Sequence, residues 1–337
     1  MPMNELPRRF KVVRTDRELE MPRVDAQLRA WGGELVVLPD GTPEPVLASE
    51  VADAELLLMC YAKIGERVLA GAPNLRAVIK YGVGIDAIDL DAARRLRIPV
   101  VNVPAYAEET VAEGAFALMI ALAKNLKKLD KAMSEDGWVW PVQSWLAADL
   151  AGKTVGLVGI GRIGSSFARM ASGFRMRVLS YDPHVVHATH RNLRGMLEES
   201  DFVSIHCVLN DETRGLIGER ELRAMKPSAY LINVSRGAIV DELALLKALQ
   251  EGGLAGAALD VYSHEPLAKQ DHPLSALYAM DNVILSPHLT FYTYEAMQRL
   301  EADTLERCEE VLEGRPVTVR SHDPRLRAQT RNVRFVD

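Results

Sequence analysis

The sequence has few cysteines, no long apolar run and no excess of basic charge. Its three cysteines, Cys60, Cys207 and Cys308, are too few and too widely spaced for a disulfide framework or a paired metal motif, which favours a reducing cytoplasm. The longest uncharged apolar run, residues 114–123, is about half of what a membrane span needs. The formal net charge of −6 gives no support to a nucleic-acid partner. We therefore expect a cytoplasmic globular protein without membrane or nucleic-acid partners.

The 337 residues are enough for about two domains, and short apolar runs alternate with helical patterns almost throughout. In the first hundred residues, the apolar runs that we interpret as strands are 10–14, 34–39, 55–61, 75–82 and 99–104. The alternation restarts after Gly152 and ends in an amphipathic helix from about Thr293 to Glu313. Strands separated by helices are typical of parallel sheets. The expected fold class is therefore α/β, with two Rossmann-like or flavodoxin-like domains.

A glycine-rich turn begins the second half of this pattern. Gly159, Gly161 and Gly164 fit G-x-G-x-x-G, and the apolar run TVGLV leads directly into them before a helical pattern starts. Such glycines permit a tight bend, close approach of a pyrophosphate, and packing of the helix on the strand. Asp182 ends the next apolar run, where a carboxylate can accept both ribose hydroxyls of NAD and repel the extra phosphate of NADP. The alternative interpretation of Asp182 is an Asp-Pro turn that ends a strand.

Two other features have plainer interpretations. His184, His187 and His190 are spaced by three residues, but their segment has no cysteine or carboxylate partner, so we expect no metal and a solvated or adenine-side loop. The basic extension from Arg320 to Arg334 is interpreted as a solvated tail rather than a contact arm.

Three chemically active side chains follow the later strands of the second domain. AYLINVS leads to Arg236, AGAALD leads to Glu265, and NVILSP ends at His288. Ligands of open α/β sheets bind outside the carboxyl ends of the strands, so these residues are expected to converge on the cofactor crevice. Arg236 could hold a substrate carboxylate, His288 could supply a proton, and Glu265 could favour the protonated imidazole and orient it. Taken singly, each could equally be a surface salt bridge, a turn carboxylate or a loop end.

Several motifs in this order resemble those of the D-isomer-specific 2-hydroxyacid dehydrogenases. They are KYGVGIDAIDL, NVPAYAEETVAEGAFALMIAL, NVSRGAIVDELAL, GAALDVYSHEP and LSPHLT, and the likeness covers about residues 50–315. Within the family, YDPH, VSIHCVLN and SPHLTFYTYEAM look most like the C-terminal-binding-protein branch, which includes bacterial enzymes and NAD-sensing transcriptional corepressors of animals.

The resemblance implies a role for each matching residue. It makes Arg236, Glu265 and His288 the catalytic triad, with Arg236 and His288 also touching substrate. The backbone N–H groups of Val83 and Gly84 would meet the substrate carboxylate, and Tyr61 and Tyr106 would line the pocket. The residues implied to bind NAD(H) are Thr110, Gly159, Gly161, Arg162, Ile163, Gly164, Asp182, Cys207, Val208, Thr213, Val234 and Asp260.

The resemblance also explains why the glycine turn comes so late. In this family the nucleotide domain is inserted into the substrate domain. The implied division is a discontinuous substrate domain of residues 1–104 and 293–320, an NAD-binding Rossmann domain of 105–292, and a C-terminal tail of 321–337.

Two regions bear on substrate and assembly. The segment 59–65 and residues 80–84 predict a mixed, partly apolar pocket for a small or medium 2-oxo acid, with Lys63 as an exposed lysine or a second anion contact.

The segment 135–145 holds Trp138, Trp140 and Trp145, which predicts a homodimer interface or, alternatively, local packing.

The sequence therefore predicts an NAD-dependent D-2-hydroxyacid dehydrogenase that interconverts a 2-oxo acid and a D-2-hydroxy acid. One alternative is an NAD-sensing interaction protein like the corepressors of the same branch, and another is a phosphite dehydrogenase of the same fold. Glu265 argues against a formate dehydrogenase, because those enzymes carry glutamine beside the histidine.

Overall fold

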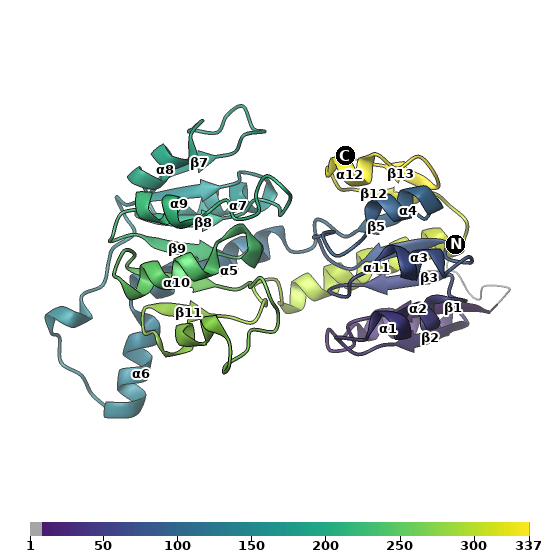
Figure 1. Ribbon diagram of the computed structural model, residues 1–337, viewed down its shortest axis with the longest axis horizontal. Coiled ribbons are helices and arrows are strands. Elements are labelled where there is room, and N and C mark those ends of the chain that lie inside the picture. Colours follow the sequence, from purple (N-terminus) through teal and green to yellow (C-terminus); the bar gives the residue numbers. More distant parts are fainter. Residues whose placement is uncertain (1–8, 337) are drawn as a thin grey trace. The chain divides into compact units, whose positions relative to one another are not determined.

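A computed structural model describes residues 9–336, which form two compact units, each built on a parallel sheet (Figure 1). Unit 1 comprises the chain up to Ala107 and from Tyr294 onward, and unit 2 is Glu108–Thr293. Because the chain leaves unit 1 and later returns to it, unit 2 is an insertion within unit 1. Among the described residues, no helix is both long and apolar enough to cross a membrane.

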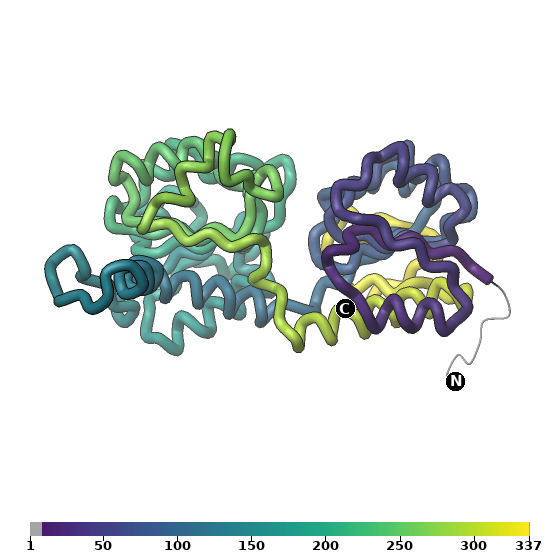
Figure 2. Tube along the Cα trace, turned by 90° about the horizontal axis from the view of Figure 1, so that it is seen from below, coloured from purple at the N-terminus to yellow at the C-terminus, as the bar shows by residue number. Residues whose placement is uncertain are grey.

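The sheet of unit 1 has the strand order β2-β1-β3-β4-β5, which is the order of flavodoxin-like folds. Helices α1 and α11 pack against each other, while α2, α3 and α4 form a row along the other side of the sheet (Figure 2). The strands are β1 (Phe10–Arg14), β2 (Gly33–Val37), β3 (Leu56–Met59), β4 (Ala77–Lys80) and β5 (Val100–Asn102). The helices are α1 (Pro22–Ala30), α2 (Glu44–Val51), α3 (Glu66–Ala70), α4 (Leu90–Leu96) and α11 (Tyr294–Leu312).

The predicted strands of this unit have the right places, but four of them are too long. The runs 55–61 and 75–82 include Cys60 and Tyr81, which are buried although they lie beyond the paired strands. Apolar character continues past the last strand residue because the first residues of these two loops, at the carboxyl edge of the sheet, are also buried. Those loops carry the predicted substrate residues.

The prediction of a solvated C-terminal tail is wrong. Residues after Arg315 form β12 (Val317–Val319), α12 (Pro324–Arg327) and β13 (Val333–Phe335), and β12 pairs with β13. Leu326 is fully buried, and the Gln329 side chain hydrogen-bonds to both the N–H and the carbonyl of Val100. The basic composition therefore did not indicate that this segment is anchored to unit 1 through Leu326 and Gln329.

Unit 2 has the strand order β11-β10-β9-β8-β6-β7. In the usual Rossmann order, a further strand lies outside the second strand of the fold, which is β7 here. In this protein that outer strand is reduced to one β-bridge between Tyr181 and His190. The strands are β6 (Thr154–Val158), β7 (Arg177–Tyr181), β8 (Phe202–Ile205), β9 (Tyr230–Asn233), β10 (Gly256–Leu259) and β11 (Val283–Leu285). The α-helices are α5 (Glu108–Ala123), α6 (Leu126–Asp136), α7 (Arg162–Gly173), α8 (Leu193–Glu199), α9 (Glu219–Ala224) and α10 (Glu242–Gln250), with short 3-10 helices η1 (Gln143–Trp145), η2 (Gly237–Ile239) and η3 (Pro273–Ala279).

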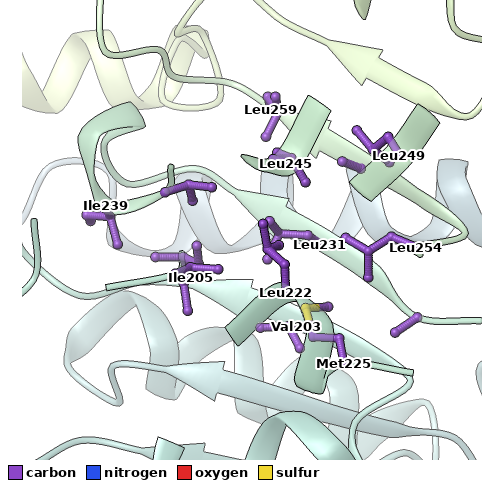
Figure 3. Packing of buried hydrophobic residues seen from close by; sticks show 14 of the residues in the cluster. Val203, Ile205, Leu222, Met225, Leu231, Ile239, Leu245, Leu249, Leu254 and Leu259 are labelled. Carbon is purple, nitrogen blue, oxygen red and sulfur yellow. The ribbon is translucent and has the colours of Figure 1, made fainter. Parts of the chain in front are cut away.

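Both faces of this sheet are covered, which is why its strands are continuous apolar runs rather than alternating ones. On one face, strand residues such as Val203 and Leu231 pack against Leu222 of α9 and against Leu245 and Leu249 of α10 (Figure 3). On the other face, a second cluster joins α5 and α7 to the sheet. These two layers hold the carboxyl ends of the strands in place.

Candidate active site

The glycine turn of unit 2 joins β6 to α7, and each glycine has its own steric reason. Gly159 has a φ of +94°, and a Cβ there would lie 2.7 Å from the backbone nitrogen of Cys207. A Cβ on Gly164 would lie 2.3 Å from the carbonyl oxygen of Gly159. A Cβ on Gly161 would have no atom of the described residues within 4 Å, so this position faces open space at the start of α7. The first and third glycines allow the chain to pack, and the second leaves room for a ligand.

Asp182 follows β7 and touches this turn. One carboxylate oxygen accepts the N–H of Ile160 at 3.1 Å, and the other accepts the N–H of His184 at 3.0 Å. The bond from the His184 N–H is typical of the Asp-Pro turn, which was the alternative interpretation of Asp182. The bond from the Ile160 N–H places the same carboxylate against the glycine turn. Asp182 therefore has both the structural contact and the position that a ribose-binding acid requires.

The other residues implied to bind the cofactor lie at the carboxyl edge of the same sheet or on helices beside it. Cys207 and Val208 follow β8, and the pKa of the Cys207 thiol is raised to about 12 by burial and by the nearby Asp182 carboxylate. Thr213 donates its hydroxyl to the Val208 carbonyl at 2.6 Å, and Arg162 contacts Glu108 at 2.9 Å.

Three of the residues implied to bind the cofactor, Val208, Val234 and Thr110, differ in exposure. Val208 is 60% exposed at the end of its strand, whereas Val234 and Thr110 are buried. An exposed valine at this strand end offers an apolar surface to a ligand, and the contacts of the buried pair with the cofactor stay a prediction.

The three predicted catalytic residues lie in one unit, after consecutive strands β9, β10 and β11. The Nδ1 atom of His288 lies 2.8 Å from Oε2 of Glu265, and Oε1 of Glu265 accepts the N–H of Tyr262 at 2.9 Å. Burial acts to raise the pKa of Glu265, but the hydrogen bond and charge of His288, the Tyr262 N–H and the charge of Arg236 together hold it below its ordinary value. The carboxylate is therefore ionised beside the imidazole.

Asp260 holds the loop that carries His288. It is fully buried, and its carboxylate accepts hydrogen bonds from the Ser286 hydroxyl at 2.6 Å, the Leu289 N–H at 3.0 Å, and the N–H and hydroxyl of Thr290 at 3.1 and 2.6 Å. His288 has a φ of +57°, a conformation that residues other than glycine rarely adopt. The hydrogen bonds to Asp260 compensate for the strain of this left-handed backbone conformation, and Asp260 therefore fixes the orientation of the His288 imidazole.

A glycine brings two of the catalytic loops together. A Cβ on Gly237, the residue after Arg236, would lie 2.0 Å from the carbonyl carbon of Tyr262. Only glycine allows the loop after β9 to pass so close to the loop that carries Glu265. The Tyr262 hydroxyl is buried and lies 3.0 and 3.1 Å from the carbonyls of Leu259 and Ser286, which ties the ends of β10 and β11 together.

The predicted substrate residues of unit 1 lie at the carboxyl edge of its own sheet. Tyr61 and Val83 are 40% and 42% exposed, Gly84 is half-buried, and Tyr106 is buried. The Val83 carbonyl accepts a hydrogen bond from the Asn102 side chain at 2.6 Å, which fixes the turn after β4.

Two buried charges, Asp16 and Lys80, support this edge. Lys80 belongs to the pocket segment 80–84 that the sequence predicts, whereas Asp16 was not predicted. The Asp16 carboxylate accepts the N–H groups of Cys60, Tyr61 and Ala62 at 2.6, 3.0 and 3.1 Å, so it shapes the loop after β3. Lys80, at the end of β4, donates to the Cys60 carbonyl at 2.6 Å and lies 3.0 Å from its sulfur. An acid two residues after the end of the first strand, in the sequence RTD, was the signal that could have indicated Asp16.

The histidine segment after β7 does not gather potential metal ligands. His190 lies 3.2 Å from Glu199 and His184 lies 3.7 Å from Glu212. Within residues 9–336 there is no group of three or more His, Cys, Asp or Glu side chains that could hold a metal ion.

The residues of the glycine turn fit a dinucleotide. The cradle at Gly161 is open, and the first N–H groups of α7, a helix of 12 residues, have no acceptor within the helix and can bind phosphate oxygens. Asp182 lies at the next strand end, the position from which a carboxylate reaches an adenosine ribose.

Comparison with known proteins agrees with this fit. Residues 116–290 match the model of the family described as D-isomer specific 2-hydroxyacid dehydrogenase, NAD binding domain. A glyoxylate reductase of Pyrococcus furiosus is 40% identical over 303 residues, which cover 85% of this chain and 87% of the relative. The likeness to the C-terminal-binding-protein branch stays a prediction.

Two solved structures show the same fold over nearly the whole chain. A D-lactate dehydrogenase from Aquifex aeolicus, complexed with NAD and lactic acid, has a TM-score of 0.81 and 30% identity and covers 90% of this chain and 96% of its own. An NADPH-dependent glyoxylate/hydroxypyruvate reductase from Sinorhizobium meliloti has a TM-score of 0.80 and 27% identity over 91% and 95%. The matches in sequence and in structure agree, and the chain belongs to the D-isomer specific 2-hydroxyacid dehydrogenase family.

Proposed function

We propose that this family member is an NADH-dependent reductase of small 2-oxo acids that produces D-2-hydroxy acids, with glyoxylate as its first candidate substrate. The observation that carries the proposal is the contact of 2.8 Å between His288 and the ionised Glu265, near Arg236, at the carboxyl edge of a dinucleotide-binding sheet. The glyoxylate reductase of Pyrococcus furiosus, 40% identical to this chain, supports the choice of substrate.

The proposed roles follow from the chemistry of each side chain. Bound NADH supplies the hydride that reduces the 2-oxo carbon. Arg236 binds the substrate carboxylate with its guanidinium group and polarises the adjacent carbonyl. Because Nδ1 of His288 is engaged by Glu265, the ring nitrogen Nε2 is the one that donates a proton to the carbonyl oxygen. One hydride and one proton are thus added across the C=O bond, and the product is an alcohol.

The ionised Glu265 supports the proton donor. A carboxylate next to an imidazole favours the imidazolium form, which is the form that can donate in the reductive direction. Asp260 and the loop from Ser286 to Thr290 keep the ring in place, so little reorganisation is needed when the proton moves.

We propose NAD(H) rather than NADP(H) as the preferred cofactor. Asp182 lies at the end of β7, and its negative charge would repel a 2′-phosphate. The Sinorhizobium meliloti relative is NADPH-dependent, so the family accommodates both cofactors and the choice depends on residues such as this one. In this proposal unit 2 is the nucleotide domain, and unit 1 contributes substrate binding through Tyr61, Val83 and Gly84.

We also propose that the protein is a homodimer. Helix α6 and the residues that follow it project from unit 2 (Figures 1 and 2). Trp138, Trp140 and Leu146 of this segment are 72%, 74% and 75% exposed, and the two indole rings lie edge to face at 6.2 Å. Large aromatic side chains in such exposed groups are typical of interface anchors. A reducing cytoplasm is proposed as the location, because none of the three cysteines in the described residues forms a disulfide.

The decisive experiment measures NADH absorbance with purified protein and a panel of glyoxylate, hydroxypyruvate and pyruvate, with phosphite and NAD in a parallel assay. His288→Asn is the matched control, since asparagine tolerates the left-handed backbone at this position. We expect glyoxylate or hydroxypyruvate to be reduced by the wild type and a loss of at least about a hundredfold in the variant. Equal rates for both proteins, or turnover of phosphite alone, would refute the proposal.

A further inference from the structure

Unit 1 contains a groove that the catalytic chemistry does not use. It lies at the amino ends of β4 and β5, whereas Tyr61, Val83 and Gly84 lie at the carboxyl edge of the same sheet. Its volume is about 540 Å³, within the range of about 300–1,000 Å³ that small-molecule sites usually have. We call it the arginine groove, because Arg76, Arg97, Arg315 and Arg331 all line it.

The charge of the arginine groove is not balanced by its own walls. Among the described residues that line it there is no aspartate or glutamate. Arg76 lies 3.5 Å from Glu55, and Arg315 contacts Glu313. The side chains of Arg97 and Arg331 have no hydrogen bond or ion pair with any residue in the described range 9–336. Two of the four positive charges are therefore available to a ligand.

Helix ends explain part of this arrangement but not all of it. Three helices, α3, α4 and α11, end at the groove, and cations stabilise the carboxyl ends of helices. Arg76 has this role, because its Nη1 lies 3.4 Å from the carbonyl of Leu312, the last residue of α11. Arg97 and Arg331 make no such contact. Arg97 moreover has a φ of +59°, a position after a helix where glycine or asparagine is usual.

The lining of the groove also includes apolar side chains. Leu75, Ile98 and Val317 line it and are themselves buried, and the walls come from segments that are far apart in the sequence. One wall, Arg331 and Asn332, belongs to the basic C-terminal segment that packs on unit 1. The segment that we first interpreted as a solvated tail thus closes a cationic site.

We propose that the arginine groove binds a small organic polyanion, a molecule with two or more carboxylate or phosphate groups on a compact body. Arg97 and Arg331 bind the anionic groups through charge-assisted hydrogen bonds, and the mixed polar and apolar lining between them receives the body of the molecule. Such a ligand contacts the sheet, α11 and the C-terminal segment together. Binding therefore stabilises unit 1 and leaves the residues of the proposed active site untouched.

The test is isothermal titration calorimetry of the full chain with citrate and, separately, with pyrophosphate, at constant ionic strength. Citrate represents the carboxylate source and pyrophosphate the phosphate source. The groove variant is Arg97→Asn with Arg331→Gln, and asparagine keeps the backbone at position 97 unstrained. The matched control is Arg94→Gln with Arg95→Gln, which removes the same charge from α4 outside the groove, where these arginines pair with Asp91 and Glu66.

We expect saturable binding of at least one probe, one molecule per chain, and a rise in the thermal unfolding midpoint. The groove variant should weaken binding at least about tenfold, since one charge-assisted hydrogen bond contributes that much. The control variant should bind like the wild type. Unsaturable binding, equal affinity in both double variants, or binding that is lost in Arg236→Gln instead would overturn the proposal, because the anion would then lie on the surface or in the catalytic site.

Discussion

The contact between Glu265 and His288 gives the sharpest test of the mechanism. Replacing Glu265 by glutamine keeps the shape of the side chain and removes its charge. The Glu265 carboxylate now accepts two N–H groups, from Tyr262 at 2.9 Å and from His288 at 2.8 Å, whereas an amide offers only one oxygen. If that oxygen remains on Tyr262, the amide NH₂ faces Nδ1 of His288 and opposes the protonated ring. The loss of the carboxylate charge and the new amide N–H donor therefore both disfavour the protonated form of the His288 ring.

The size of the effect follows from the exposure of the pair. The side chains of His288 and Glu265 are 22% and 31% exposed, between surface pairs, which contribute about 0–1 kcal/mol, and buried pairs, whose disruption costs about 3–5 kcal/mol. We take about 1.5 kcal/mol, which corresponds to roughly a tenfold change in a rate or equilibrium constant. In the reductive direction the rate falls as pH rises and the proton donor is lost. In Glu265→Gln the midpoint of this descending limb should therefore move to lower pH, and kcat at neutral pH should fall by up to about tenfold.

The measurement is the pH profile of kcat for 2-oxo acid reduction at saturating NADH. Glu242→Gln is the matched control, because Glu242 accepts the N–H of Ser263 at 2.8 Å on the same loop. It should leave the midpoint unchanged, and NADH affinity should be unaffected in both variants. A Glu265→Gln enzyme with wild-type rates and an unmoved limb would show that Glu265 is only a loop carboxylate.

Three further predictions concern cofactor choice, geometry and assembly. Asp182→Ala should erode the preference for NADH over NADPH, measured as the ratio of kcat/KM values; equal use of both cofactors by the wild type would remove the basis of this prediction. Asp260→Asn should lower kcat at least about tenfold, because the loop of His288 loses an anionic acceptor; an unchanged kcat would contradict the proposed anchoring. Replacing Trp138 and Trp140 by alanine should shift a dimer toward monomer in analytical ultracentrifugation, whereas a wild-type monomer at micromolar concentration would exclude the interface.

Much of the site could be predicted from local sequence because parallel sheets place the carboxyl ends of their strands at one edge. Knowing only that Arg236, Glu265 and His288 each follow a strand was enough to expect them together, and the structure brings His288 within 2.8 Å of Glu265. Gly159, Gly161 and Gly164 could likewise be interpreted from their spacing. The positive φ of Gly159 and the contact of Gly164 with the Gly159 carbonyl are local requirements of the turn, whereas Gly161 leaves open space for a ligand.

Long-range packing explains what the sequence did not indicate. The contact of Asp260 with the cofactor stays a prediction. Its hydrogen-bond partners Ser286 and Thr290 are 26 and 30 residues away, and no local sequence pattern indicates that their donors bind one carboxylate. The glycine at 237 similarly reflects contact with Tyr262 across two loops.

The two ends of the chain show the same difference between what local sequence predicts and what long-range packing decides. Alternating apolar runs at the start of the chain predicted the parallel sheet of unit 1, because a buried strand must be apolar along its length. The C-terminal segment has a basic composition typical of a solvated tail, yet Leu326 is buried and Gln329 bonds to Val100, 229 residues away. Local sequence determines which segments can form strands and tight turns, because backbone sterics and burial periodicity act over a few residues. Only the tertiary structure decides which distant segments meet, because that depends on the free energy of packing the whole chain.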